Sequence, residues 1–451
     1  MEPFVTQGNR HRYSRRRCLA LTSGATALLM GACAPAGPGQ PQTVKERQPV
    51  TLRDQRGSTP GSAVALSDEA IKLKHPWLTV VHEGGGSSSA EAMAKLVVMA
   101  ASGDLPDIIY AQGTQIQYYI SQKIVISLSP YLAKDKEFDL ADFPKVAVEM
   151  YSRGGQVYAI PYDHGPNMLW YNADLFAKHG VAPPHERWTW DDLLLAARQL
   201  TVERDGQWGL MDNGPRGQWT LLSYLAPWGA YWVDDAETKT TIDSTQAVNA
   251  MQYFMDLYFK HKVAPVPGTY VSAWNNPENP FLAGKVAMVL GGPWTIREWI
   301  GKVAFQTPIA DWPIGPAGKR VSSSMGSGYP ITTTSKHPDE AWLYVSEFLG
   351  KDIERSMMGQ FVKLGTGTPV RFSLMKEYEK SSFAPPNAQL IAPSANYSLI
   401  GRPISPIKAD LDLIWAEEMA ALWQQSTTVK DMLSAVQRRM VPVLERNKAG
   451  F

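Results

Sequence analysis

Residues 281–294 read Phe-Leu-Ala-Gly-Lys-Val-Ala-Met-Val-Leu-Gly-Gly-Pro-Trp, and the strand they predict is central to the architecture of the chain. The apolar centre, residues 286–290, lies between Gly284-Lys285 and Gly291-Gly292-Pro293, which indicates a short buried strand flanked by turns. Trp294 follows at the end of that strand, where open α/β sheets bind ligands. An indole face suits the apolar C–H face of a sugar ring. The alternative is a core tryptophan after a tight turn.

The length and composition predict a globular protein of two domains. With 451 residues the chain exceeds one ordinary hydrophobic core. Its net charge of +1 gives no reason to expect nucleic acid as a partner. Cys18 and Cys33 are the only cysteines, and both precede the expected folded domain. We therefore expect no disulfide, no thiolate metal site and no cofactor in that domain.

Residues 1–33 predict an export signal that is not part of the fold. A basic run over residues 10–17 precedes a weakly apolar segment, residues 19–32, and then Cys33. The apolar segment is shorter than the ~20 residues that span a bilayer. The Pro/Gly/Gln-rich residues 34–48 predict a flexible tether.

Two motifs in this leader are similar to known signals. The run Ser14-Arg15-Arg16-Arg17-Cys18-Leu19 resembles a twin-arginine signal, with Cys18 where an aromatic residue is commoner, so Arg15 and Arg16 are expected to direct export. The run Leu29-Met30-Gly31-Ala32-Cys33 resembles a bacterial lipobox, with Met30 at a place usually held by leucine. Cys33 is therefore expected to carry a lipid anchor.

The segment after the tether predicts alternating strands and helices. Strands are expected over residues 50–53, 78–82 and 106–110, and helices over residues 63–74 and 87–101. This alternation is typical of a parallel sheet. Tyr110, Gln112 and Thr114 would then lie at the C-terminal end of a strand, where ligands bind. Tyr110 closing the sheet edge is the alternative.

Further along the chain, several helices and one strand are expected. Helices are indicated by capping residues and apolar periodicity, and the strand follows a glycine turn. One helix is expected to begin after the N-cap Thr189. Four others are expected over residues 244–261, 339–349, 410–423 and 428–444, and the strand is expected over residues 327–335.

Other candidate ligand contacts are polar or aromatic residues in loops. Asp163 follows a strand that ends at Pro161, and both of its oxygens could accept from a sugar diol. A turn-forming aspartate is the alternative. Trp228 lies between Pro227 and Gly229, and Trp274 lies in the loop before the opening stretch.

Five blocks in order, over residues 49–445, resemble family 1 extracellular solute-binding proteins, the sugar-binding components of ABC importers. Residues 281–294 resemble the family's F-x-x-G-K-x-A-M segment, and residues 100–108 resemble its A-S-G-x-x-P-D signature. Residues 365–371 resemble its G-x-x-P-v-r element. The return strand and helix match at six positions, which are Ile331, Ser335, Lys336, Ala341, Trp342 and Tyr344.

The resemblance implies an α/β, two-lobed periplasmic-binding-protein fold of type II-like form. Each lobe would be a mixed sheet flanked by helices, with a ligand cleft between the lobes. Residues 49–163 plus 329–383 would form the N-terminal lobe, and residues 164–328 plus 384–451 the C-terminal lobe.

The lobe connections add candidate ligand contacts. Gly328 and Tyr329 lie in a second segment that is expected to connect the lobes, as the segment near Asp163 does. Arg371 could offer its guanidinium to sugar hydroxyls, with a charged surface residue as the alternative.

The resemblance also implies a function without catalysis. The protein would be a monomeric substrate-binding lipoprotein, anchored at the outer face of the cytoplasmic membrane, that delivers a sugar or oligosaccharide to an ABC permease. Arg53 and Arg56 leave another polar solute open, such as a glycerol phosphodiester. Asp163 with Glu278 leaves an exported glycoside hydrolase open. The G-x-S-x-G and H-E-x-x-H motifs of enzymes are absent.

Overall fold

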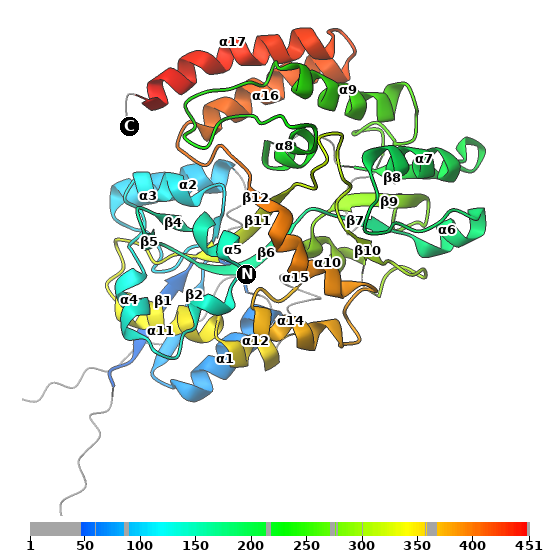
Figure 1. Ribbon diagram of the computed structural model, residues 1–451. Helices are drawn as coiled ribbons and strands as arrows, with labels where there is room; N and C mark the ends of the chain where they lie inside the picture. Colours follow the sequence, from blue (N-terminus) through cyan, green and yellow to red (C-terminus); the bar gives the residue numbers. More distant parts are fainter. Residues whose placement is uncertain are drawn as a thin grey trace, which may run out of the picture. The chain divides into compact units, whose positions relative to one another are not determined.

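The computed structural model describes residues 47–58, 60–84, 90–212, 218–270, 276, 278–299, 301–356, 358 and 368–448. Arg15, Arg16, Cys33, most of the tether and Trp274 lie outside these ranges, as does the side chain of Trp294. Within these ranges, no helix combines the length and the apolar character that crossing a membrane requires. The segment from Gln48 onward is one compact unit (Figure 1).

The first βαβ unit is formed as the sequence predicts. Strand β1 (Val50–Asp54) pairs in parallel with β2 (Leu78–His82), and α1 (Ala63–Lys74) connects them. Ser62 caps α1 by accepting from the Ala65 amide. Helix α2 (Ala90–Ser102) follows and ends before Gly103, whose φ is 72°. These predictions are confirmed to within a few residues.

The third expected strand is not regular. Ile108 makes only single bridges, parallel to Asp54 and antiparallel to Ile331. The strand β3 comes later, at Ala111–Gln112. Because Ile108 lies between neighbours of opposite sense, this edge belongs to a mixed sheet rather than to the parallel sheet that the sequence suggested.

A long antiparallel pair joins the two halves of the chain. Strand β6 (Ile160–Pro166) pairs with β11 (Ser322–Tyr329), which also pairs with β3 and, in parallel, with β12 (Ser398–Ile400). The return strand therefore begins five residues before the predicted residues 327–335. It begins with Ser322-Ser323-Ser324, which has no apolar pattern, so sequence periodicity did not reveal this part of the strand.

The strand predicted from the opening stretch is central to the second sheet. Strand β9 (Val286–Gly291) lies between β7 (Met168–Tyr171) and β8 (Trp208–Met211), and β10 (Ile309–Ala310) pairs with β7. Residues 286–290 are all buried, as expected. The chain then turns through the 3-10 helix η4 (Pro293–Thr295), so Trp294 follows the end of the strand as predicted.

Helices cover this second sheet, and most were predicted. Thr189 and Asp192 form the expected capping box at the start of α7 (Trp190–Leu200). Helix α9 (Thr245–Phe259) begins after its N-cap Ser244. Helices α16 (Lys408–Trp423) and α17 (Val429–Lys448) pack on each other, and α17 packs on α9 (Figure 1).

The remaining elements are short, apart from α11. The helices are α3 (Ile116–Ser121), α4 (Ser129–Lys134), α5 (Lys145–Met150), α6 (Ala173–His179), α8 (Gln218–Leu225), α10 (Ile296–Trp299), α11 (Pro338–Phe348), α12 (Lys351–Ser356), α14 (Phe372–Glu379) and α15 (Ile391–Ser394). The short strands are β4 (Ser152–Arg153) and β5 (Gln156–Val157). The 3-10 helices are η1 (Leu140–Asp142), η2 (Glu203–Asp205), η3 (Ala226–Trp228), η5 (Ala388–Leu390) and η6 (Ala395–Tyr397).

The hydrophobic clusters support the proposed lobes with one adjustment. Leu52 and Trp342 share a cluster of the first part of the chain with the return helix α11. Leu374 and Tyr378 of α14 instead belong to a cluster with Trp299 of the second part. We therefore propose that the chain returns to the second lobe near residue 372 rather than at residue 384.

Candidate ligand-binding site

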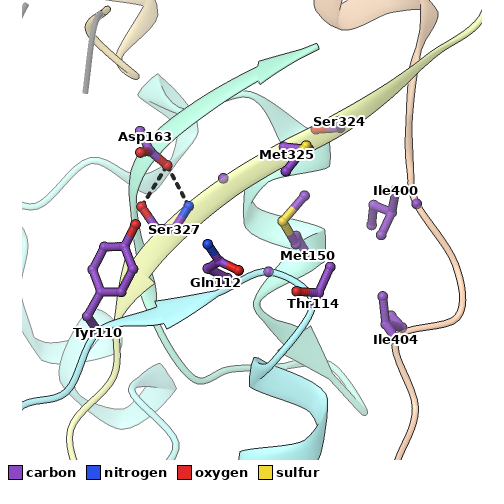
Figure 2. A pocket seen from close by; sticks show the side chains of 13 residues that line it. Tyr110, Gln112, Thr114, Met150, Asp163, Ser324, Met325, Ser327, Ile400 and Ile404 are labelled. Carbon is purple, nitrogen blue, oxygen red and sulfur yellow. Dashed lines mark hydrogen bonds between the residues drawn. The ribbon is translucent and has the colours of Figure 1, made fainter. Parts of the chain in front are cut away.

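A cavity of about 370 Å³ lies beside the paired strands β6 and β11. Its walls come from β3 and the turn after it, α5, β6, β11 and the segment after β12 (Figure 2). The lining residues are Tyr110, Gln112, Gly113, Thr114, Met150, Asp163, Ser324, Met325, Gly326, Ser327, Ile400, Gly401 and Ile404.

One side of the cavity is polar. Asp163 Oδ1 accepts hydrogen bonds from the backbone N–H of Ser327 at 2.5 Å and from its hydroxyl at 2.7 Å. These bonds cross from β6 to β11 and fix the orientation of the carboxylate (Figure 2). Tyr110 and Gln112 come from the adjacent segment, where side-chain oxygens of Gln55 and Gln115 accept their backbone N–H groups. The polar side is therefore held by hydrogen bonds within the protein.

The opposite side is apolar and was not predicted. Met150 and Met325 contribute thioethers, and Ile400 and Ile404 contribute branched side chains (Figure 2). A Cβ at Gly113 would lie 1.8 Å from the Met150 sulfur, so only glycine lets Met150 occupy its place. These apolar residues come from three distant parts of the chain, and none of them belongs to a recognisable motif. Sequence patterns therefore gave no signal for them.

The structure brings Tyr110, Gln112, Thr114 and Asp163 together at the cavity. Gly328 and Tyr329 are not among the lining residues. Tyr329 is buried, and its ring packs edge-on against that of Tyr110 with centroids 5.8 Å apart. Tyr329 thus supports a lining residue. A Cβ at Gly328 would lie 2.8 Å from the Ile160 carbonyl oxygen, so this glycine permits close pairing of the strands.

Arg371 does not offer its guanidinium to the cavity. It is 3 % exposed, and its Nη1 and Nε lie 3.5 Å from carboxylate oxygens of Asp142 and Glu354. It also donates to the Leu349 carbonyl at 2.8 Å. Burial shifts the pKa of Arg371 downward, and the two carboxylates oppose that shift. The prediction of a ligand contact is wrong because protein groups already occupy this side chain.

Trp228 is half-buried against the hydrophobic interior and is not among the residues that line the cavity. The 3-10 helix η3 continues directly from α8, so the Pro-Trp-Gly sequence is not an open loop. The Trp228 ring packs 5.5 Å from Trp190 and 5.2 Å from Tyr253, centroid to centroid. The proline and glycine were signals of a turn, and the turn folds this indole onto α7 and α9.

His164 follows Asp163 on β6 and is enclosed beneath the cavity. Its Nε2 lies 2.5 Å from the hydroxyl of Ser324, a lining residue. Burial lowers the pKa of His164 from its ordinary value of 6.5 to about 4. The imidazole is therefore neutral in the folded protein at neutral pH.

The lowered pKa predicts a pH-dependent loss of stability. Between pH 6.5 and about 4 the unfolded chain binds a proton at His164 that the folded protein does not. The contribution of neutral His164 to the free energy of unfolding is therefore complete above pH 6.5. It is lost as the pH falls towards 4, and the total loss is about 3 kcal/mol. Urea unfolding of wild type and His164→Gln at pH 7 and pH 4.5 measures this. The difference between the two proteins should shrink at pH 4.5, and a difference independent of pH would contradict the assignment.

Comparison with known proteins identifies the family. The model of bacterial extracellular solute-binding proteins matches residues 59–354, and the chain belongs to this family. It is 25% identical over 331 residues to the lactose-binding protein of Rhizobium radiobacter, covering 68% of this chain and 74% of that one. It is 24% identical over 289 residues to the arabinooligosaccharide-binding protein of Bacillus subtilis (strain 168), covering 61% of each chain.

Solved structures share the fold. An ABC substrate-binding protein from Listeria monocytogenes in complex with cycloalternan has a TM-score of 0.78 at 21% identity, covering 90% of this chain and 100% of that one. The GacH receptor of Streptomyces glaucescens has a TM-score of 0.73 at 24% identity, covering 88% and 99%. The predicted two-lobed α/β fold is thereby confirmed.

Proposed function

We propose that this protein is the substrate-binding component of an ABC importer and that it captures a sugar or oligosaccharide in the cavity beside β6 and β11. The observation that carries the proposal is the division of the cavity. Hydroxyl, amide and carboxylate groups line one side, and Met and Ile side chains line the other. A pyranose has the same two kinds of surface, hydroxyls at its edge and C–H groups on its face. The lactose- and arabinooligosaccharide-binding relatives support this class of ligand.

The arginines that left a phosphate ligand open are engaged elsewhere. Arg53 Nε lies 2.5 Å from a Glu83 carboxylate oxygen and Arg53 Nη1 lies 2.6 Å from one of Asp104. The Arg56 guanidinium pairs with Asp54 in the interior. Among the described residues that line the cavity there is no lysine or arginine. An anionic solute would therefore meet only the negative charge of Asp163, which disfavours a glycerol phosphodiester.

The hydrolase alternative needs two carboxylates facing one substrate. Asp163 supplies one, but Glu278 is exposed and does not line the cavity. No other carboxylate appears among the described lining residues. The described part of the chain also contains no group of three or more His, Cys, Asp or Glu side chains placed to hold a metal ion. The family and the relatives are binding proteins, and we propose binding without catalysis.

We further propose that ligand closes the two lobes around the cavity, with β6 and β11 as the connection that bends. Trp294 and Trp274 remain proposed stacking partners from the second lobe. Such closure would present the occupied form to the permease. The protein would act as a monomer.

Membership of an extracellular family implies export, and we propose that Arg15 and Arg16 direct it through the twin-arginine route. Cys33 would then carry the lipid anchor at the outer face of the cytoplasmic membrane. Cys33→Ser is expected to abolish palmitate labelling and to release the protein from the membrane fraction. Cys18→Ser is the matched control, because it lies in the leader that cleavage before Cys33 would remove. Labelling that persists in Cys33→Ser would contradict the anchor.

A panel of neutral sugars tests the function directly. Lactose, arabinooligosaccharides and maltodextrins are added to the purified protein, with glycerol phosphodiesters as the comparison. A ligand at one hundred times its Kd stabilises the folded state by about 2.7 kcal/mol, because it binds only that state. We expect at least one sugar to raise the melting temperature and the phosphodiesters to leave it unchanged. The reverse pattern would replace the sugar by the phosphodiester, and release of hydrolysed sugar would make the protein an enzyme.

A further inference from the structure

The segment after β12 forms one wall of the cavity and lies outside the two strands that carry the polar groups. Ile400, Gly401 and Ile404 line the cavity, and we call residues 400–404 the wall segment. At its start, β12 pairs with β11 through Ile400 and Ser324. Beyond Ile400 it leaves the sheet, so the position of Ile404 depends on other contacts.

One buried carboxylate, Glu237, holds the backbone of the chain at this point. Its Oε1 accepts the backbone N–H of Ile404 at 2.9 Å and its Oε2 accepts that of Ser405 at 3.0 Å. The Arg402 guanidinium donates to Oε1 at 3.1 Å. The Glu237 side chain is only 4% exposed. Three donors on one enclosed carboxylate make a strong attachment, because charge-assisted hydrogen bonds are strengthened away from water.

The backbone of Glu237 is held in an unusual conformation that delivers this carboxylate. Its φ is 54°, a left-handed value that is uncommon for a residue with a side chain. The preceding Asp234 fixes the turn by accepting the N–H groups of Thr238 at 2.7 Å and Lys239 at 3.0 Å. From α17, Asn447 donates to the Glu237 carbonyl oxygen at 2.9 Å. A strained residue held from several sides suggests a specific role.

We infer that Glu237 is a positioning residue for ligand binding, which holds the wall segment so that Ile404 stays against the ligand. This inference rests on the proposed function, since it concerns the same cavity. Glu237 does not line the cavity itself and acts through the backbone of residues 404 and 405. The turn that carries it is far from the cavity residues in sequence, so no motif links the two.

The test uses Glu237→Gln in the full mature protein. Glutamine keeps the shape but replaces one accepting oxygen by an NH₂ group, which cannot accept a backbone N–H. We expect faster hydrogen exchange at the amides of Ile404 and Ser405 in the ligand-free protein, and roughly tenfold weaker binding of the sugar that stabilises wild type. Asp235→Asn is the matched control. It lies in the same turn and 3.5 Å from Arg402 Nε, but its side chain is fully exposed.

A double-mutant cycle separates positioning from general damage. If Glu237 acts through Ile404, the loss of affinity in Glu237→Gln combined with Ile404→Ala will be smaller than the product of the two single losses. Glu237→Asp, which keeps the charge on a shorter side chain, should give a partial loss and serves if the glutamine variant folds poorly. Multiplicative losses, or unchanged exchange at both amides, would overturn the inference. If wild type binds no sugar, the proposed function fails, and the exchange measurement alone decides whether Glu237 holds the wall segment.

Discussion

Replacing Arg56 by methionine is expected to lower the free energy of unfolding by about 3–5 kcal/mol, because it leaves a buried carboxylate without its partner. Asp54 is completely buried and accepts from Arg56 Nε at 2.7 Å and from Nη2. The same guanidinium lies 4.0 Å from the centroid of the Tyr329 ring and 4.2 Å from that of Phe348. Methionine would fill much of the volume but supply no charge. Urea unfolding measures the loss.

Arg53 provides the matched comparison for this prediction. It lies on β1, three residues before Arg56, and also pairs with carboxylates, but its side chain is 37% exposed. Arg53→Met is therefore expected to cost only about 0–1 kcal/mol, as exposed ion pairs usually do. If both variants lose the same free energy of unfolding, burial of the Asp54–Arg56 pair does not determine how much the pair stabilises the protein.

Replacing Asp163 by asparagine is expected to weaken sugar binding by roughly tenfold to a hundredfold. Asparagine can still accept from Ser327 through one oxygen, so the strand pairing should survive. The second oxygen becomes a donor, and a sugar hydroxyl then loses a charged acceptor worth about 1.5–3 kcal/mol. Isothermal titration with the sugar that raises the wild-type melting temperature measures the effect.

Two controls guard the Asp163 result. Asp352→Asn changes an exposed aspartate on α12 that does not line the cavity and should leave the affinity unchanged. The ligand-free melting temperature of Asp163→Asn should stay within a few degrees of wild type. Unchanged affinity in a folded Asp163→Asn protein would remove this carboxylate from the site.

Much of the fold could be predicted from the sequence, because the patterns that indicate its strands and helices lie within short stretches of the chain. The strand at residues 286–290 is bounded by glycine turns, and the capping box at Thr189 is formed by residues three apart. The apolar face of α9 follows helical spacing, and Met251 and Met255 on that face are buried. The start of β11 was missed because its serines have no apolar period. They are buried by pairing with distant segments, which local sequence does not record.

The candidate site was only partly readable for a related reason. Tyr110 was expected at the C-terminal end of a strand, and it lines the cavity. Asp163 was expected to follow a strand that ends at Pro161, but it lies inside β6, whose pairing with β11 was not predicted. Arg371 could not be distinguished from a ligand contact, because its partners Asp142 and Glu354 lie far from it in sequence or carry no motif. Glu237 binds the backbone N–H groups of residues 404 and 405. Almost any residue type at those positions has this N–H group, so the sequence gives no sign of the interaction.

The packing of Trp228 against Trp190 has a consequence for optical measurements. Trp190 and Trp312 are fully buried and pack edge-on against each other, and the rings of Tyr253 and Phe254 also pack against Trp190. Trp170, Trp299 and Trp415 are enclosed in other parts of the interior. Much of the ultraviolet emission of the protein therefore originates in rings that no described contact places at the cavity. Their emission will change strongly when the chain unfolds and exposes them to water, so tryptophan fluorescence is well suited to following the melting shifts on which the ligand assay depends.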